Sequence, residues 1–235
     1  MLPVVVLAGG LGTRVETLTG GVLPKALLPV AGRPFVDHKL EQLRHEGVSS
    51  VVLLVGHRAQ PIVEHVGDGS RYGMAVRCVE DGPVLLGTGG AVRAALDSLP
   101  DAFWVTYGDT LLDAPMEDIE ARFLADDVDG LMTVLHNRDR WQPSNVTIDG
   151  KRVVAYSKGD PPGTHEHIDY GLLLFRRDVF AALPEGRPFD LADALRPLVS
   201  ARRLGAYVVT TRFRDIGTVE ALAETEAELR RRPAT

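Results

Sequence analysis

The sequence has little cysteine and no excess of positive charge. Cys78 is the one cysteine among 235 residues, so the chain cannot form an internal disulfide, and a chain of this length needs none. The formal net charge is −6, which leaves no broad basic surface for nucleic acid. We therefore expect no nucleic-acid partner, although a phosphate site needs only a few local cations.

Long apolar runs are also missing. The apolar run near the N-terminus, Leu2 to Ala8, is short and follows no basic stretch, so it does not resemble a signal peptide. No run approaches the length of a membrane span. We expect a cytoplasmic protein without a membrane partner, and the chain is long enough for one large α/β domain.

Three common active-site motifs do not occur in the sequence. It contains no P-loop string, G-x-x-x-x-G-K-[ST], and no G-x-S-x-G nucleophile elbow of the serine hydrolases. The dinucleotide fingerprint G-x-G-x-x-G/A fails because Val15 stands at its third small position when it is counted from Gly10. These absences argue against three common enzyme classes.

A glycine-rich segment follows the first apolar run. Leu2 to Ala8 is rich in valine and ends at Gly9-Gly10-Leu11-Gly12-Thr13-Arg14, which is typical of a buried strand that enters a tight loop. Glycines let a ligand approach the backbone N–H groups, and Arg14 adds a planar cation suited to phosphate oxygens. Lys25, which follows Pro24, is a second cation nearby. The segment predicts a phosphate site, or else a plain surface turn after an edge strand.

The first half of the chain alternates strands and helices. Apolar patterns predict strands at 51–55, 75–79 and 103–107 and helices at 36–43, 61–66, 92–99 and 116–124. This alternation predicts a mostly parallel sheet covered on both faces, in which ligands bind beyond the carboxyl ends of the strands. Three segments lie at such ends and are expected to converge: Gly9 to Arg14, a glycine loop at Gly87–Ala91, and Gly108-Asp109.

The pattern changes after about residue 129. Strands are predicted at 131–135, 168–175 and 207–209, and a hairpin of 145–148 and 153–156 turns at Asp149-Gly150. Helices are predicted at 178–183 and 190–200. A last helix follows Asp215-Ile216-Gly217, with Thr218 as its candidate N-cap.

Three stretches together resemble the signature of the sugar-1-phosphate nucleotidyltransferases. They are LAGGLGTR (residues 7–14), PKALLPV (24–30) and Gly32-Arg33-Pro34. The resemblance implies a Rossmann-like α/β fold, a three-layer sandwich with a mostly parallel mixed central sheet and a small lid-like β insertion. It also implies one domain over 1–235, with a nucleotide-binding half at about 1–128 and a sugar-binding half at 129–235.

The resemblance implies the reaction NTP + sugar 1-phosphate → NDP-sugar + pyrophosphate, with Mg²⁺ as the cofactor. Two multiply charged anions meet in this reaction, so the protein supplies positioning and charge neutralisation without a covalent intermediate. The implied catalytic residues are Arg14, Lys25, Asp109, Lys158 and Asp215. Asp109 and Asp215 would hold Mg²⁺, which prefers carboxylate oxygens; the alternative for each is an ordinary turn aspartate.

The other site residues are also implied by the resemblance. The nucleotide-binding positions are Leu7, Ala8, Gly9, Gly10, Gly12, Thr13, Arg14, Lys25, Glu80, Gly87, Thr88 and Gly108. The sugar-binding positions are Gly89, Asn145, Lys158, Asp169, Tyr170 and Gly171. The sequence departs from the family at Ser157, where members have a glutamate that contacts a sugar hydroxyl, and at Asn145, where members often have glycine.

The segment Leu86-Gly87-Thr88-Gly89-Gly90-Ala91 looks most like the D-glycero-α-D-manno-heptose 1-phosphate guanylyltransferases. This implies GTP and a heptose 1-phosphate as substrates, with Glu80 or Asp81 accepting hydrogen bonds from guanine. Three alternatives stay open: a UTP- or dTTP-dependent hexose or cyclitol 1-phosphate nucleotidyltransferase, a molybdopterin-type nucleotidyltransferase, and a non-catalytic subunit that senses NDP-sugar. The expected assembly is a monomer or a homodimer.

Overall fold

Short, mostly apolar strands alternate with helices along the chain. The computed structural model describes residues 1–10, 23–56, 59–82 and 84–231. Its strands are β1 (Val4–Leu7), β2 (Pro29–Val30), β3 (Arg33–Pro34), β4 (Ser50–Val55), β5 (Ala75–Glu80), β6 (Ala102–Tyr107), β7 (Thr110–Leu111), β8 (Gly130–His136), β9 (Val146–Asp149), β10 (Arg152–Tyr156), β11 (His167–Arg176), β12 (Leu204–Val209) and β13 (Arg214–Asp215). Its α-helices are α2 (Phe35–His45), α3 (Ala59–Val66), α4 (Gly87–Ala94), α5 (Met116–Ala125), α6 (Asp178–Ala181), α7 (Leu191–Ser200) and α8 (Val219–Arg231). None of these described helices has both the length and the apolar character needed to cross a membrane.

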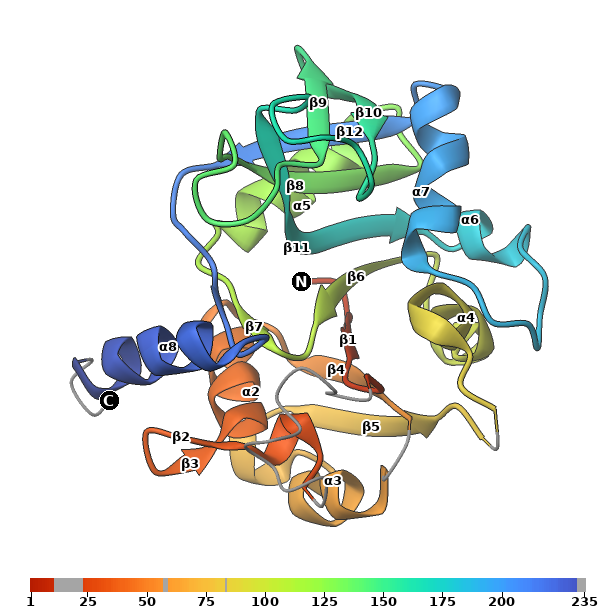
Figure 1. The fold of residues 1–235 in the computed structure, drawn as a ribbon. Helices are drawn as coiled ribbons and strands as arrows, with labels where there is room; N and C mark the ends of the chain where they lie inside the picture. Colours follow the sequence, from red (N-terminus) through yellow and green to blue (C-terminus); the bar gives the residue numbers. More distant parts are fainter. Residues whose placement is uncertain (11–22, 57–58, 83, 232–235) are drawn as a thin grey trace.

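One sheet runs through both halves of the chain. Within the described ranges it has nine strands in the order β5-β4-β1-β6-β11-β8-β12-β10-β9. The strands from β5 to β6 are mutually parallel, whereas β11 is antiparallel to both β6 and β8. The β6–β11 pairing therefore joins the first half of the chain to the second, as Figure 1 shows.

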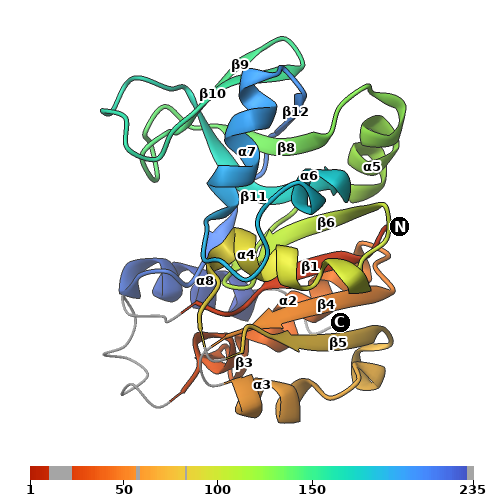
Figure 2. The ribbon, with the colours of Figure 1, turned by 90° about the vertical axis from the view of Figure 1, so that its right-hand side faces the viewer.

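Helices cover both faces of this sheet and make three layers (Figure 2). Side chains alternate along β1: Val4 and Val6 pack in one core with α2, α3 and α5, whereas Val5 packs in a second core with α4, α6 and α7. Because β1 is buried on both faces, its sequence is a continuous apolar run instead of an alternating one. The structure confirms the predicted α/β class, with a mixed sheet between two helical layers.

The predicted hairpin in the second half is present. β9 and β10 pair antiparallel, and Gly150 in their turn has a φ of 55°. β10 also pairs antiparallel with β12, so the hairpin extends the far edge of the sheet. These strands lie at the top of the molecule in Figure 1, beyond β8.

We expected the segment Gly87–Ala91 to be a loop, but the structure shows that it is the beginning of α4. The N–H groups of Gly89 and Gly90 donate to the carbonyl of Phe189 at 3.0 and 3.2 Å. These bonds satisfy donors that the first turn of a helix leaves free. A contact with a segment far along the chain thus supports a helix that its glycines disfavour.

A two-stranded ribbon ties the C-terminal part of the chain to the centre. β13 pairs antiparallel with β7, with Asp215 opposite Thr110. α8 follows, and the Thr218 hydroxyl accepts a hydrogen bond from the Ala221 N–H at 3.1 Å, so the predicted N-cap is confirmed. α8 packs on a small apolar cluster that includes Phe35 and Ile216.

The turn between α3 and β5 provides a test of stability. Gly67 and Gly69 both have positive φ, 61° and 83°. A Cβ on Gly69 would lie 2.4 Å from Val76 Cγ2 and 2.7 Å from the Met74 carbonyl, whereas a Cβ on Gly67 would meet no described atom within 4 Å. We expect Gly67→Ala to lower the free energy of unfolding by about 1–2 kcal/mol through backbone strain, and Gly69→Ala by about 1–3 kcal/mol more through overpacking. Urea unfolding of both variants measures the difference, and equal losses would contradict the steric argument.

Candidate active site

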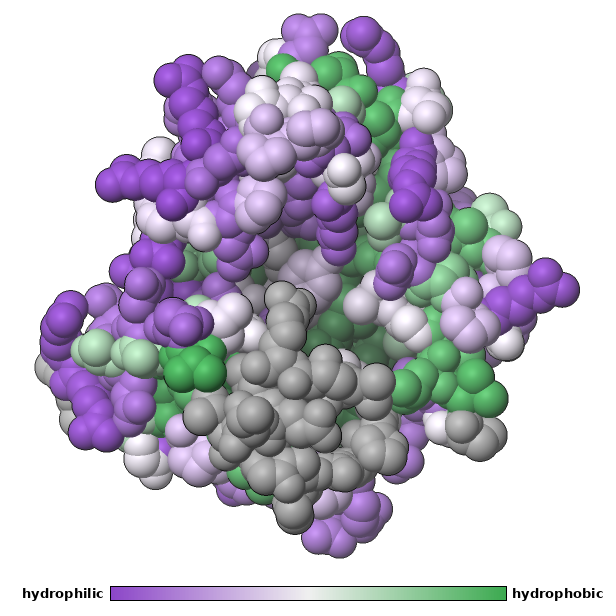
Figure 3. Space-filling view, viewed as in Figure 1, coloured by the Kyte–Doolittle hydropathy of each residue, from purple (hydrophilic) through white to green (hydrophobic). Residues whose placement is uncertain are grey.

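Two cavities meet at the carboxyl ends of β1 and β6. The first, the β1 cavity, has a volume of about 400 Å³ and is lined by the end of β1, Lys25, Asp81, the start of α4 and the Tyr107–Asp109 segment. The second, the β11 cavity, has a volume of about 260 Å³ and lies along β11 between Ile168 and Gly171. Tyr107 and Asp109 line both cavities, so the two form one site with a shared wall. Figure 3 shows this region as a hollow in the middle of the face.

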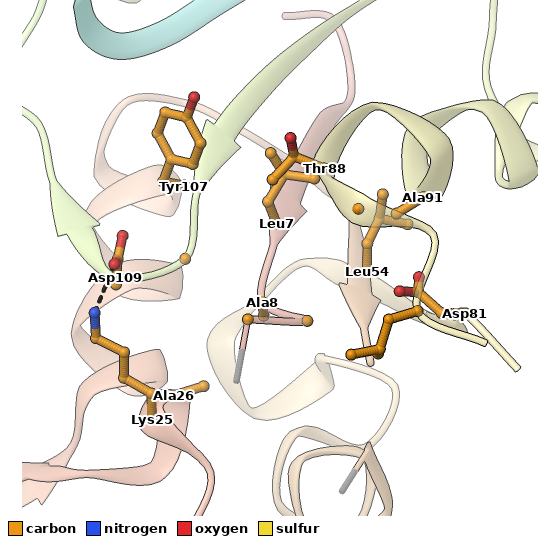
Figure 4. A pocket seen from close by; sticks show the side chains of 15 residues that line it. Leu7, Ala8, Lys25, Ala26, Leu54, Asp81, Thr88, Ala91, Tyr107 and Asp109 are labelled. Atoms are coloured by element: carbon orange, nitrogen blue, oxygen red, sulfur yellow. Dashed lines mark hydrogen bonds and ion pairs between the residues drawn. The ribbon is translucent and has the colours of Figure 1, made fainter. Parts of the chain in front are cut away.

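The three segments predicted to converge do converge around the β1 cavity. Gly9 and Gly10, Gly87 and Thr88, and Gly108 with Asp109 all line it. Figure 4 shows Lys25 and Asp109 on one side of the cavity and Leu54, Asp81 and Ala91 on the other. One end of the cavity is thus charged, and the opposite end is largely apolar.

Glycines let the strand ends approach closely at this cavity. A Cβ on Gly56, just after β4, would lie 2.7 Å from the Gly9 carbonyl, and a Cβ on Gly9 would lie 3.0 Å from the Gly56 nitrogen. A Cβ on Gly108 would lie 2.8 Å from the Leu7 carbonyl. Gly56 carries no signal in the sequence, because a lone glycine after a strand gives no sign of which backbone it will contact.

Gly89 is not placed as the resemblance implied. It is buried in the first turn of α4, where a Cβ would lie 2.4 Å from the Phe189 ring. Gly89 lines neither cavity, so the structure gives it a packing role instead of a sugar contact. Its neighbour Thr88 does line the β1 cavity, and the Thr88 hydroxyl accepts a hydrogen bond from the Leu191 N–H at 2.8 Å.

Asp81, and not Glu80, is the carboxylate at the apolar end of the β1 cavity. Glu80 is exposed at the end of β5 and does not line the cavity. Burial raises the pKa of Asp81, although one oxygen accepts a hydrogen bond from the Leu86 N–H at 3.3 Å. Successive side chains of a strand point to opposite sides, and the sequence alone did not show whether Glu80 or Asp81 points into the cavity.

Asp109 and Lys25 form the charged end. The Lys25 ammonium donates to Asp109 Oδ2 at 2.7 Å, and the Thr110 hydroxyl donates to Oδ1 at 3.1 Å. Burial by itself would raise the pKa of Asp109, but the charge and hydrogen bond of Lys25 outweigh it and lower the pKa below its ordinary value. Asp109 is therefore ionised at neutral pH.

Asp215 lies beside Asp109 because β13 pairs with β7. The Ile216 N–H donates to the Asp109 carbonyl at 3.0 Å. The Asp215 carboxylate accepts hydrogen bonds from the Gly217 N–H at 2.7 Å and from the Gln142 amide at 3.3 Å. A Cβ on Gly217 would lie 2.8 Å from Asp215 Oδ1 and 3.9 Å from Lys25 Nζ, so the absence of a side chain there keeps the space between these groups open.

The donor set here suits a hard divalent cation. The carboxylates of Asp215, on β13, and of Asp109, just before the paired strand β7, lie near the Lys25 ammonium, which is already a positive charge in this region. Among the described residues no cluster contains three or more metal-binding side chains, so the protein would offer two carboxylates and leave the remaining positions to water and phosphate oxygens. Mg²⁺ is usually bound in this way.

The β11 cavity gathers the other polar residues implied by the resemblance. Asn145, Lys158, Asp169, Tyr170 and Gly171 all line it. Burial raises the pKa of Asp169, while the Gly171 N–H and the charge of Lys158 act in the opposite direction. The Asn145 side-chain oxygen accepts a hydrogen bond from the Asp169 N–H at 2.9 Å, which leaves the Asn145 amide N–H groups as donors. The Tyr170 hydroxyl is engaged elsewhere, since it donates to the Asp113 carbonyl.

Two residues of this site gave no clear signal in the sequence. Gln142 lines the β11 cavity from a loop whose sequence matches no motif, and it reaches Asp215 only through the fold. Tyr107 forms the wall between the cavities, and its ring lies so close to Gly171 that a Cβ there would be 3.0 Å from Tyr107 Cδ2. Gly12, Thr13 and Arg14 lie outside the described residues.

The chain belongs to the nucleotidyl transferase family, because the model of that family matches residues 3–232. It is 32% identical over 232 residues to the mannose-1-phosphate guanylyltransferase of Mycobacterium tuberculosis, across 96% of this chain and 64% of that protein. It is 25% identical over 217 residues to the D-glycero-alpha-D-manno-heptose 1-phosphate guanylyltransferase of Campylobacter jejuni, across 92% of this chain and 95% of that protein. The chain thus spans less than two thirds of the first relative.

Solved structures share the fold. HddC from Yersinia pseudotuberculosis, complexed with GMP-PN, superposes with a TM-score of 0.83 at 25% identity and covers 97% of this chain and 100% of its own. The inositol-1-phosphate CTP transferase from T. maritima superposes with a TM-score of 0.80 at 20% identity, across 100% of this chain and 98% of its own, which shows the fold alone. The expected family and fold are therefore confirmed.

Proposed function

We propose that the protein is a sugar-1-phosphate nucleotidyltransferase that uses GTP. One observation carries the proposal: Asp109 stands in the wall shared by two cavities, with Lys25 beside it in the first and Lys158 in the second. Two phosphorylated substrates placed in these cavities would meet at a pair of carboxylates flanked by cations. A non-catalytic sensor of NDP-sugar would need only the binding surface and not this arrangement of charges.

The residues fit a direct transfer between two anions. A phosphate oxygen of the sugar 1-phosphate attacks the α-phosphorus of the nucleotide, and the bond to pyrophosphate breaks on the opposite side. Lys25 neutralises charge at the α-phosphate, and Lys158 binds the attacking phosphate. Backbone N–H groups at Gly9 and Gly10, with Arg14, bind the β- and γ-phosphates. Positioning and charge neutralisation of this kind supply most of the rate in phosphoryl-type transfers.

Asp109 and Asp215 would hold Mg²⁺. The ion neutralises phosphate charge when it is bound. Asp109 is pre-positioned for this task by Lys25 and Thr110, and Asp215 by the Gly217 N–H.

Removal of either carboxylate charge tests this assignment. We expect Asp109→Asn and Asp215→Asn each to lower kcat by on the order of 10²-fold or more, as loss of a preorganised electrostatic group does. Pyrophosphate release at saturating Mg²⁺ measures the effect. Asp113→Asn is the matched control, because Asp113 is exposed just beyond β7 and lines neither of the two cavities. A near-normal kcat in either site variant would exclude a metal-binding role for that residue.

Guanine fits the apolar end of the β1 cavity. Leu54, Leu85 and Ala91 offer apolar contacts, and the Asp81 carboxylate offers an acceptor for guanine N–H groups. Uracil and thymine present fewer donors to such a carboxylate and leave it poorly paired. The names of two relatives in Mycobacterium tuberculosis and Campylobacter jejuni, both guanylyltransferases, support the same base.

Asp81 is the residue that tests the choice of base. We expect Asp81→Asn to lower kcat/KM for GTP by about 10- to 100-fold, as loss of a hydrogen bond to a charged acceptor does, with little change for UTP and dTTP. The measurement is kcat/KM for GTP, UTP, dTTP, CTP and ATP with one sugar 1-phosphate. Glu80→Gln, which changes the adjacent exposed carboxylate, is the control. Wild-type preference for a pyrimidine nucleotide would reject GTP and favour the uridylyl- or thymidylyltransferase alternative.

The sugar is proposed to be a heptose 1-phosphate or a similar polyol. Ser157 does not line the β11 cavity, and its hydroxyl donates a hydrogen bond to Asp160. Besides Asp109 and Asp215, this cavity is lined by the carboxylate of Asp169, with the Asn145 amide beside it. An acceptor and donors are therefore both available for sugar hydroxyls. The Campylobacter relative acts, by its name, on such a heptose phosphate; a hexose or a cyclitol is the alternative.

A substitution at Lys158 tests which of the two substrates this residue binds. We expect Lys158→Ala to raise KM for the sugar 1-phosphate, or to lower kcat, by about tenfold or more, because it removes a charge-assisted contact to phosphate. Calorimetric affinity for GTP should stay unchanged, since Lys158 does not line the β1 cavity. Lys151→Ala, at an exposed lysine on the nearby hairpin turn, is the control. Weakened GTP binding with normal sugar KM would reverse the assignment.

A further inference from the structure

Lys39 is a buried lysine that the proposed reaction does not use. It lies on α2 with 1% of its surface exposed, and none of the described carboxylates forms an ion pair with it. Burial lowers the pKa of Lys39 to about 7, although the negative charge of Asp109 acts in the opposite direction. Burial of an amine costs free energy of folding unless hydrogen bonds compensate for the lost contact with water.

The hydrogen bonds of Lys39 bridge the two ends of one short turn. Its Nζ donates to the Thr106 hydroxyl at 3.1 Å and to the Thr110 carbonyl at 2.8 Å. Thr106 is in the last part of β6 and Thr110 begins β7, so the residues between these two anchors are Tyr107, Gly108 and Asp109. One buried amine thus holds both sides of the turn that forms the shared wall of the cavities.

The turn is held from the opposite side by β13. The Ile216 N–H donates to the Asp109 carbonyl, and Asp215 lies opposite Thr110. Lys39 on α2 and the β13 strand are therefore two independent attachments of the same segment. Loss of the Lys39 attachment would leave two buried acceptors unpaired and free the β6 side of the turn.

We propose that Lys39 is a positioning residue that fixes the Thr106–Thr110 turn and thereby sets the place of Asp109 for Mg²⁺. The inference rests on the proposed function, since it assumes the metal role of Asp109. Lys39 touches neither cavity and acts only through the turn.

The direction in which Lys39→Met changes Mg²⁺ affinity distinguishes a positioning role from a purely electrostatic one. A positive charge near Asp109 repels Mg²⁺, so if Lys39 acted only through its charge, Lys39→Met would strengthen Mg²⁺ binding. If Lys39 positions Asp109, the same variant weakens it. Residues that orient metal ligands from outside the ligand shell typically contribute about 10- to 100-fold in metal affinity.

The experiment is a double-mutant cycle of Lys39→Met and Thr106→Val, read by calorimetric titration of Mg²⁺ and by the Mg²⁺ dependence of pyrophosphate release. We expect Lys39→Met to raise the Mg²⁺ dissociation constant by about 10- to 100-fold. Thr106→Val should raise it less, because the bond from Lys39 to the Thr110 carbonyl remains. The double variant should be no worse than Lys39→Met, since both changes remove the same contact.

Several outcomes overturn the inference. These are an unchanged or lower Mg²⁺ dissociation constant in Lys39→Met, or additive effects in the double variant. If Lys39→Met does not fold, Thr106→Val decides alone, and Mg²⁺ binding equal to wild type rejects the role of the bridge. Failure of the proposed function is a distinct result, in which wild type releases no pyrophosphate with any pair of nucleotide and sugar 1-phosphate. In that case calorimetry of Mg²⁺ binding still compares wild type with Thr106→Val. The inference is overturned if the two proteins bind Mg²⁺ equally, or if neither binds it.

Discussion

The pairing of β13 with β7 is the contact on which the candidate site depends. It sets Asp215 opposite Thr110 and adds a hydrogen bond from Ile216 to the Asp109 carbonyl. Two carboxylates from distant parts of the chain become neighbours in this way, Asp109 in the wall that the two cavities share and Asp215 in the lining of the β11 cavity. Like charges so placed repel each other, and Lys25 offsets part of that repulsion by pairing with Asp109.

Close backbone contacts shape the space around these charges. Gly9 and Gly56 bring the ends of β1 and β4 together, and Gly217 leaves room beside Asp215 and Lys25. A side chain at any of these positions would collide with backbone or with a carboxylate. Glycines therefore shape the site as much as charged side chains do, because they expose backbone N–H groups to which phosphates of a ligand can bind.

The charge distribution explains how an acidic chain can bind two anions. The net charge is −6, yet single lysines are placed where the phosphates are proposed to lie, Lys25 in one cavity and Lys158 in the other. Half-buried carboxylates, those of Asp81 and Asp169, line the regions proposed for the base and the sugar ring. The remaining negative charge lies on other surfaces and does not determine what the cavities bind.

The local pattern of the sequence was enough for the alternation of strands and helices, the hairpin at Gly150 and the N-cap at Thr218. These features depend on neighbouring residues, on side-chain period and on turn chemistry, which a single stretch of sequence contains. The alternation was also enough to predict that the glycine segment after β1, the segment at Gly87 and Gly108-Asp109 would converge, because the carboxyl ends of parallel strands lie at one edge of a sheet. The sites of Lys158 and Asp169 were implied only by the resemblance to the family.

Only the tertiary structure decided the details that depend on distant contacts. Hydrogen bonds to the Phe189 carbonyl stabilise Gly87–Ala91 as the start of a helix, in which Gly89 does not line the cavity. Asp81 lines the cavity, and Glu80 does not. It also brought Gln142 into the site, and placed Gly56 and Lys39 next to the segments that form it, from parts of the chain without a motif. The physical reason is common to all of these: which face of an element is buried, and which carbonyl it meets, depends on residues far away in the chain, and no local pattern records them.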